Sequence, residues 1–147
     1  EAVRLEPKNP AAWQARGEGW LEHGDNVDQA LSDLQEALMC GAPTATLLTA
    51  RARAWLTKKQ FEQAVTDCSE AIRIDGEFAP AYLVRGEASA ELGLHDQALE
   101  NFFEYSTREP FDPRPFVLGS RSRHATGDSA GGARDEARAR ELGWDGP

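Results

Sequence analysis

The chain has 147 residues and a formal net charge of −9 at pH 7, with 40% apolar and 28% charged residues. This length and composition are typical of one soluble globular domain with a substantial core. Because a nucleic-acid site needs a basic face, the acidic balance predicts no nucleic-acid partner. No apolar run in the sequence approaches the roughly 18–20 residues that span a bilayer, which predicts no membrane segment.

A 34-residue period organises the sequence. Segment 45–78 aligns with segment 79–112 without a gap, and a one-residue insertion around residues 25–27 brings the preceding segment into register. The aligned columns pair Leu48 with Tyr82, Ala52 with Gly86, Ala64 with Ala98, Cys68 with Phe102 and Ala71 with Tyr105. Small and larger apolar residues therefore recur at helical spacing, which indicates an array of helical hairpins that cannot bury their apolar faces singly.

The register predicts the elements in chain order, and none of them is a strand. The helices are expected near residues 10–23, 28–39, 45–58, 61–74, 79–92, 96–107, 114–125 and 133–142. Between the last two, the glycine-rich stretch 127–132 is interpreted as a turn.

The spacing of aromatic and small residues closely resembles the tetratricopeptide repeat (TPR) family. The residues that carry the resemblance are Trp13, Gly17, Trp20, Ala30 and Ala37, followed by Tyr82, Gly86, Ala98, Phe102 and Pro110. The resemblance implies an all-α solenoid of antiparallel helical hairpins that forms a right-handed superhelix with a concave groove. Ser89 stands where the family has an aromatic residue, so the third repeat is expected to pack more loosely.

This register divides the chain into five segments. Residues 1–9 match the tail of a preceding repeat, 10–44, 45–78 and 79–112 form three full repeats, and 113–147 form a degenerate fourth repeat with a capping helix. The opening segment has two interpretations. Either the chain is a piece of a larger protein, or a short helical stub serves as a natural cap.

The sequence contains no pattern that predicts catalysis, a cofactor or a metal site. Glu18 with Glu22, and Glu87 with Glu91, are carboxylate pairs one helical turn apart. Paired carboxylates need burial in a shaped pocket before their pKa values separate, and an open groove supplies neither. We therefore expect a non-enzymatic protein without a cofactor.

The two cysteines are not spaced like metal ligands. Cys68 occupies the repeat column of Phe102 and is expected to be a small buried hydrophobic residue, whereas Cys40 lies beside Gly41 at a helix end. This usage favours a reducing compartment and hence a cytoplasmic location.

In the TPR family the first helix of each hairpin lines the concave groove. Carrying that register across predicts groove residues Gln14, Glu18, Leu21, Thr49, Arg53, Leu56, Leu83, Val84, Glu87 and Arg121. This mixed surface suits a helix or extended segment of a partner protein with apolar anchors and some Lys or Arg. The predicted function is therefore a non-catalytic protein–protein interaction module.

One known use of TPR grooves is not expected here. The subfamily that binds the carboxylate tails of heat-shock chaperones uses Lys, Asn and Arg at set groove positions. In this chain those positions hold Gln14, Glu18, Ala50, Pro80 and Val84. We therefore predict a protein or peptide partner that is not a chaperone tail.

Two other functions remain open. The domain could be an accessory or regulatory part of a larger enzyme whose catalytic part lies outside this sequence. Alternatively, it could be a self-assembly scaffold in which an open terminal repeat stacks on another copy, so the expected state is a monomer or a weakly self-associating one.

Overall fold

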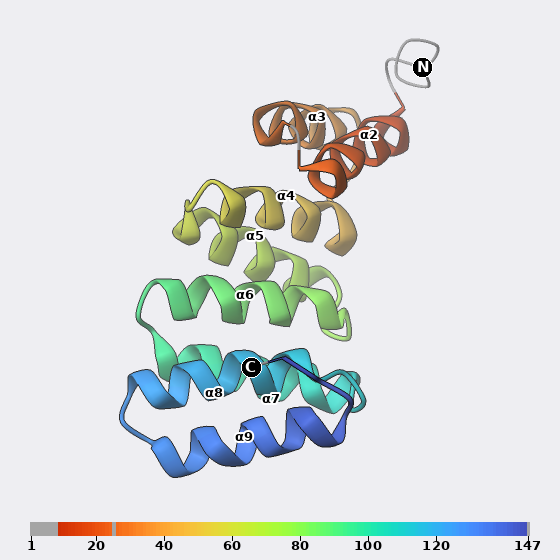
Figure 1. Cartoon of the computed structure of the whole chain (residues 1–147). Helices are drawn as coiled ribbons and strands as arrows, with labels where there is room; N and C mark the ends of the chain where they lie inside the picture. Colours follow the sequence, from red (N-terminus) through yellow and green to blue (C-terminus); the bar gives the residue numbers. More distant parts are fainter. Residues whose placement is uncertain (1–8, 25, 147) are drawn as a thin grey trace. The chain divides into compact units, whose positions relative to one another are not determined.

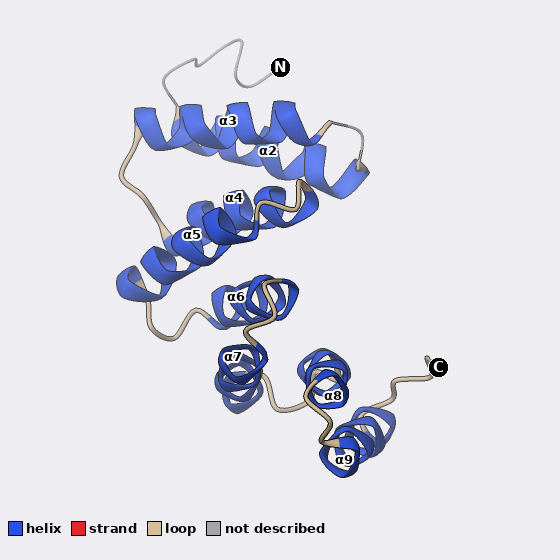
Figure 2. Ribbon diagram, turned by 90° about the vertical axis from the view of Figure 1, so that its left-hand side faces the viewer, coloured by secondary structure: helices blue, strands red, loops and turns tan. Residues whose placement is uncertain are grey.

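The structure is a computed structural model that describes residues 9–24 and 26–146. Most of the predicted tail of a preceding repeat, residues 1–9, lies outside the described residues. Within them the secondary structure consists of α-helices without any strand (Figure 1, Figure 2), which confirms the all-α prediction. The helices are α2 (Pro10–His23), α3 (Val27–Cys40), α4 (Ala45–Thr57), α5 (Phe61–Ile74), α6 (Ala79–Glu91), α7 (His95–Arg108), α8 (Arg114–Ala125) and α9 (Ser129–Glu141). No helix in this described part is long and apolar enough to cross a membrane.

Local capping chemistry sets both ends of α2. Asn9 accepts hydrogen bonds from the backbone N–H groups of Ala11 and Ala12, and Pro10 occupies the first helical position, where no donor is lost. At the other end of α2, Gly24 has a φ of +70° and ends the helix in the left-handed conformation that glycine adopts readily.

The last helix begins earlier than the sequence predicts. We expected it to start at residue 133 after a glycine-rich turn, but α9 begins at Ser129. Asp128 caps it by accepting a hydrogen bond from the Gly131 N–H at 2.9 Å. Gly132 lies inside the first turns, where a Cβ atom would come within 2.6 Å of the His124 ring. The glycines therefore permit close approach of α8 and α9 rather than ending a helix.

The chain divides into two compact units, residues 1–78 and 79–147. In the first unit α2 packs on α3, α4 packs on α5, and α3 packs on α4. In the second unit α6 to α9 pack in the same pattern. Within each unit the two first helices of the hairpins, α2 and α4 or α6 and α8, also contact each other. We propose one repeat per hairpin, at 10–44, 45–78, 79–112 and 113–147.

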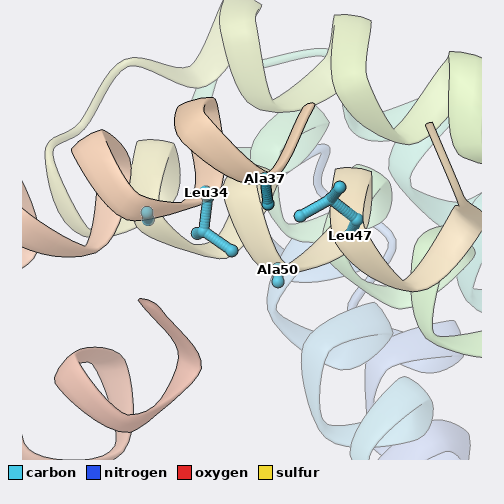
Figure 3. Close-up of a cluster of buried hydrophobic side chains, with 5 residues drawn as sticks. Leu34, Ala37, Leu47 and Ala50 are labelled. Atoms are coloured by element: carbon cyan, nitrogen blue, oxygen red, sulfur yellow. The ribbon is translucent and has the colours of Figure 1, made fainter. Parts of the chain in front are cut away.

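The core of the first unit lies where α2, α3 and α4 meet. Its buried residues are Leu34, Ala37, Leu47, Ala50 and Ala54 (Figure 3), with Trp13, Leu21, Val27, Leu31 and Leu38 packed around them. In this unit the apolar face of the first hairpin is thus buried by α4 of the second hairpin, as expected for a repeat array.

Small residues occupy the helix crossings, as the register predicts. A Cβ atom on Gly17 would lie 2.8 Å from Leu34 Cγ, and one on Gly86 would lie 2.5 Å from Phe102 Cε1. Both distances are far below van der Waals contact, so only glycine allows these helices to approach as closely as they do.

Candidate functional site

The predicted groove residues lie on the first helix of each hairpin. In the first unit α2 carries Gln14, Glu18 and Leu21, and α4 carries Thr49, Arg53 and Leu56. In the second unit α6 carries Leu83, Val84 and Glu87, and α8 carries Arg121. Because the first helices of each unit contact each other, each unit presents its own two-helix face. A single groove along all four hairpins stays a prediction.

These residues differ in how accessible they are. Thr49, Leu83 and Val84 are buried, with exposed fractions of 3%, 5% and 6%. Arg53 and Arg121 are exposed, and the other five are half-buried. The accessible part of the predicted surface is therefore more polar than the full set suggests.

One repeat column on this face carries alternating charge. The ninth position of each hairpin is Glu18, Arg53, Glu87 and then Arg121. Glu18 accepts a hydrogen bond from the Gln14 side chain at 2.9 Å. In the described part of the chain, neither the Arg53 nor the Arg121 guanidinium has a hydrogen bond or an ion pair. Each unit thus presents one glutamate and one unpaired arginine on neighbouring first helices.

A second set of charges joins the two helices of a hairpin. In the first hairpin, Asp33 is fully buried and accepts hydrogen bonds from Arg16 Nε and Nη2 at 2.5 and 2.7 Å. Trp20 Nε1 and Gln29 Nε2 also donate to Asp33, at 3.1 and 2.8 Å. Burial raises the pKa of Asp33, but the hydrogen bonds from Arg16 and the other donors outweigh it and leave the pKa below its usual value.

The second hairpin repeats this arrangement. Arg51 Nε and Nη2 both donate to Asp67 at 2.7 Å, and Trp55 Nε1 donates to the same carboxylate at 3.1 Å. Arg51 Nη1 also donates to Gln35 Oε1 on α3 at 2.7 Å, so this arginine connects two hairpins. A surface pocket of about 330 Å³ lies beside this pair, and its lining is Arg51, Trp55, Glu62, Gln63, Thr66 and Asp67.

The second unit keeps the column but changes its chemistry. In the third hairpin Arg85 Nε donates to the neutral Asn101 at 2.8 Å, and Ser89 replaces the tryptophan. In the fourth, Gly119 replaces the arginine, and Arg123 donates to Asp135 at 2.8 Å from the tryptophan column. We did not predict these pairs, although the recurrence of Arg and Asp at one repeat spacing was visible in the sequence.

Two of the three histidines make short contacts within their own hairpins. His23 Nδ1 lies 2.8 Å from the Gly19 carbonyl oxygen, and His124 Nε2 lies 3.1 Å from Glu136 Oε1. Among the described residues there is no group of three His, Cys, Asp or Glu side chains that could hold a metal ion. Cys68 is buried in its helix, as expected from its repeat column, and Cys40 is exposed.

The geometry defines a class of protein: helical hairpins that pack on one another within each unit, with small residues where the two helices of a hairpin cross. Within the described residues the chain has the fold of the tetratricopeptide repeat proteins, which confirms the resemblance found in the sequence. The TPR domain of Arabidopsis OM64 is 28% identical, with a TM-score of 0.75 over 79% of this chain and 95% of that one. YrrB, described as a TPR protein with an unusual peptide-binding site, is 17% identical with a TM-score of 0.82 over 98% of this chain and 74% of that one.

Two further similarities complete the comparison. MamA of Desulfovibrio magneticus RS-1 is 16% identical, with a TM-score of 0.85 over 95% of this chain and 78% of that one. Mouse sperm-associated antigen 1 (Mus musculus) is 33% identical over 100 residues, which are 68% of this chain and 10% of that protein. This chain therefore spans about a tenth of the length of that relative. No family model matches the chain.

Proposed function

We propose that the chain is a non-catalytic interaction module that binds a segment of a partner protein along its first helices. The observation that carries the proposal is the alternating column of Glu18 and Arg53 in the first unit, and Glu87 and Arg121 in the second. Exposed arginines without an ion pair can bind carboxylates of a partner in bidentate geometry. The similarity to YrrB, described as having a peptide-binding site, supports this function.

The spacing of the column suggests what the partner segment contains. Packed helices lie about 8–10 Å apart, and an extended chain advances about 3.3 Å per residue. A Lys or Arg that meets Glu18 would therefore be about three residues from the Asp or Glu that meets Arg53. Half-buried Leu21 and Leu56 offer apolar contacts on the same two helices.

The structure also supports a partner other than a chaperone carboxylate tail. Of the positions that bind such tails in related proteins, Ala50 and Val84 are buried, with exposed fractions of 4% and 6%, and neither can donate a hydrogen bond from its side chain. Gln14 is engaged with Glu18, whose negative charge repels a tail of the same sign. We therefore expect these helices to recognise a partner segment by its shape and by charges of both signs.

We propose a role without catalysis because the buried carboxylates Asp33 and Asp67 are each paired with an arginine. A larger protein could still carry catalytic parts elsewhere. The match to about a tenth of sperm-associated antigen 1 favours a second candidate function, in which this unit is one binding domain of a longer, multidomain protein. In that case the same first-helix faces would hold the partner, and a cytoplasmic location remains our proposal for the compartment.

Selection from a random peptide library tests the proposed face without knowledge of the natural partner. The immobilised protein is screened against displayed 12-residue peptides beside an Arg53→Glu, Arg121→Glu variant. We expect the unmodified protein to enrich peptides with Lys or Arg about three residues from Asp or Glu. The variant should lose the preference for Asp and Glu, because its column carries only negative charge.

Arg134→Glu is the matched control, since Arg134 is an exposed arginine on the second helix of its hairpin. This variant should select the same peptides as the unmodified protein. Identical selections by the unmodified protein and the Arg53→Glu, Arg121→Glu variant would show that the peptide binds elsewhere. Far-UV circular dichroism of all three proteins verifies that the helices are intact.

A further inference from the structure

Two equivalent helix junctions differ in a way that creates a pocket. At the α3/α4 junction of the first unit, Arg51 donates to Gln35 across the two helices. Two repeats further along, at the α7/α8 junction of the second unit, the same columns hold Gly119 and Phe103. A polar pair has thus been replaced by a glycine and a phenylalanine.

The replacement leaves a cavity of about 160 Å³ between α7, α8 and α9. Its walls include Leu99, Phe102 and Phe116, with Gly119 lining the space that arginine fills at the earlier junction. A cavity of about 150 Å³ lined by such side chains accommodates a benzene ring. The volume therefore matches one phenyl or leucyl side chain.

Phe103 lies at the rim of this cavity and is 66% exposed. An exposed aromatic ring beside an apolar cavity is typical of an interaction site. At one end of the cavity Arg123 and Asp135 neutralise each other at 2.8 Å, so that end offers no net charge to a ligand.

The α7 side of the cavity carries negative charge, whereas Arg138 of α9 lies over the ring of the wall residue Phe116. Asp96 and Glu100 are exposed on α7, seven and three residues before Phe103, and therefore on the same helical face. Neither carboxylate has a hydrogen bond or an ion pair within the described part of the chain. A ligand with an apolar anchor would meet this negative face with Lys or Arg about one helical turn away.

We propose that this α7/α8 pocket is a second docking site, which binds a basic amphipathic helix of a partner protein. One Phe or Leu of that helix fills the cavity against Phe103 and Gly119. Its Lys or Arg side chains lie over Asp96 and Glu100. This is helix-in-groove recognition, and it uses residues other than the column of Glu18, Arg53, Glu87 and Arg121.

The repeat itself supplies the variant that tests the site. Phe103→Gln with Gly119→Arg restores the polar pair of the α3/α4 junction and fills the cavity with an arginine side chain. A Cβ on Gly119 would lie 3.1 Å from Asp135 Oδ2 and 3.6 Å from Leu99 Cδ2, so the new side chain needs only a small shift of its neighbours. Phe103→Gln alone is the safer second variant, because Phe103 is on the surface.

The probe is a fluorescein-labelled 16-residue helical peptide of Lys and Ala with one central Phe, which is its only large apolar side chain. Binding is measured by fluorescence anisotropy, and the contact is located by amide chemical shifts of Phe103 and Gly119 in NMR spectra. We expect saturable binding that weakens at least tenfold in the double variant, and about fivefold in Phe103→Gln. Peptides with Phe→Ala or with every Lys→Glu should also bind at least tenfold more weakly.

Arg121 is on α8 but does not line the pocket. Arg121→Glu should therefore leave this binding unchanged, which separates the site from the first-helix face. The proposal is overturned if the double variant binds the peptide as tightly as the unmodified protein while remaining helical. It is also overturned if no peptide binds saturably. Sedimentation that shows a dimer dissolved by Phe103→Gln would instead make a second copy the occupant.

Discussion

The two units share a backbone pattern but stabilise their hairpins with different chemistry. In the first unit, Asp33 and Asp67 each receive an arginine fork and a tryptophan N–H. In the second unit the third hairpin has a neutral Asn101, and the fourth obtains its arginine from another column. The comparison shows that the fold requires small residues at the crossings more strictly than any one polar pair. At the fourth hairpin, where Gly119 replaces the arginine, a small cavity lies between α7, α8 and α9.

The largest difference between the units should come from removing the arginine. Arg16→Ala leaves the fully buried carboxylate of Asp33 without its charged partner, which we expect to cost about 3 kcal/mol of unfolding free energy. Arg85→Ala leaves a neutral amide and should cost about 1 kcal/mol. Chemical denaturation followed by circular dichroism measures both.

A double variant separates buried charge from lost packing in this comparison. Arg16→Met with Asp33→Leu removes both charges and keeps similar volumes, so it should recover most of the stability lost in Arg16→Ala. If Arg16→Ala and Arg85→Ala lose the same unfolding free energy, the charge of Asp33 adds nothing to the cost of removing the arginine.

Substitutions at the helix crossings should change the unfolding free energy by less. Gly86→Leu should cost about 1–3 kcal/mol by overpacking, because a Cβ there already lies 2.5 Å from the rigid Phe102 ring. Gly17→Leu should cost slightly less, since the nearest contact of its Cβ, Leu34 Cγ, lies at 2.8 Å, with the Ala30 carbonyl oxygen at 3.2 Å. Melting temperatures show which of the two variants is less stable.

Gly19→Ala is the control for this pair, because its Cβ would meet nothing within 4 Å. Alanine favours a helix more than glycine does, so this variant should raise stability by up to about 1 kcal/mol. A melting curve of Gly86→Leu that matches the unmodified protein would disprove the crossing geometry.

The sequence predicted the helices well because period, caps and small residues agree with one another. The start of α9 was missed because Gly131 and Gly132 read as a turn, whereas they serve the close approach of α8. That approach involves the ring of His124 on α8, so it depends on how two helices pack against each other. A local rule cannot recognise it.

The candidate site was predicted only in part, since a register gives the face of a residue but not its depth. Thr49 and Leu83 lie on the expected helices, yet both are buried. The arginine–aspartate pairs recur at one repeat spacing in the sequence, but a column of charges does not show whether they pair within the hairpin or face solvent. The cavity beside Gly119 depends on the volumes of side chains from three helices, which no single column reveals.

Acid titration gives the smallest expected effect, and it concerns a network that only the second unit has. Tyr105 Oη donates to Asp112 at 2.6 Å, and Arg114 Nη2 donates to the same carboxylate at 2.5 Å. Burial raises the pKa of Asp112, but hydrogen bonds from Arg114 and Tyr105 outweigh it and lower the pKa to about 2. Burial and the hydrogen bond to Asp112 raise the pKa of Tyr105 to about 12.

The sign of the pH dependence follows from these directions. The unfolded carboxyl titrates near pH 3.9, so the contribution of Asp112 to stability is complete above that pH and is lost as pH falls through about 2. Between pH 7 and pH 3, the unfolding free energy of Asp112→Asn should therefore fall by about 1 kcal/mol less than that of the unmodified protein. Asp33 remains in both proteins, so the first unit contributes equally to each. Unfolding free energies at the two pH values measure the difference. If the variant loses as much unfolding free energy as the unmodified protein, Asp112 does not stabilise the second unit through its charge.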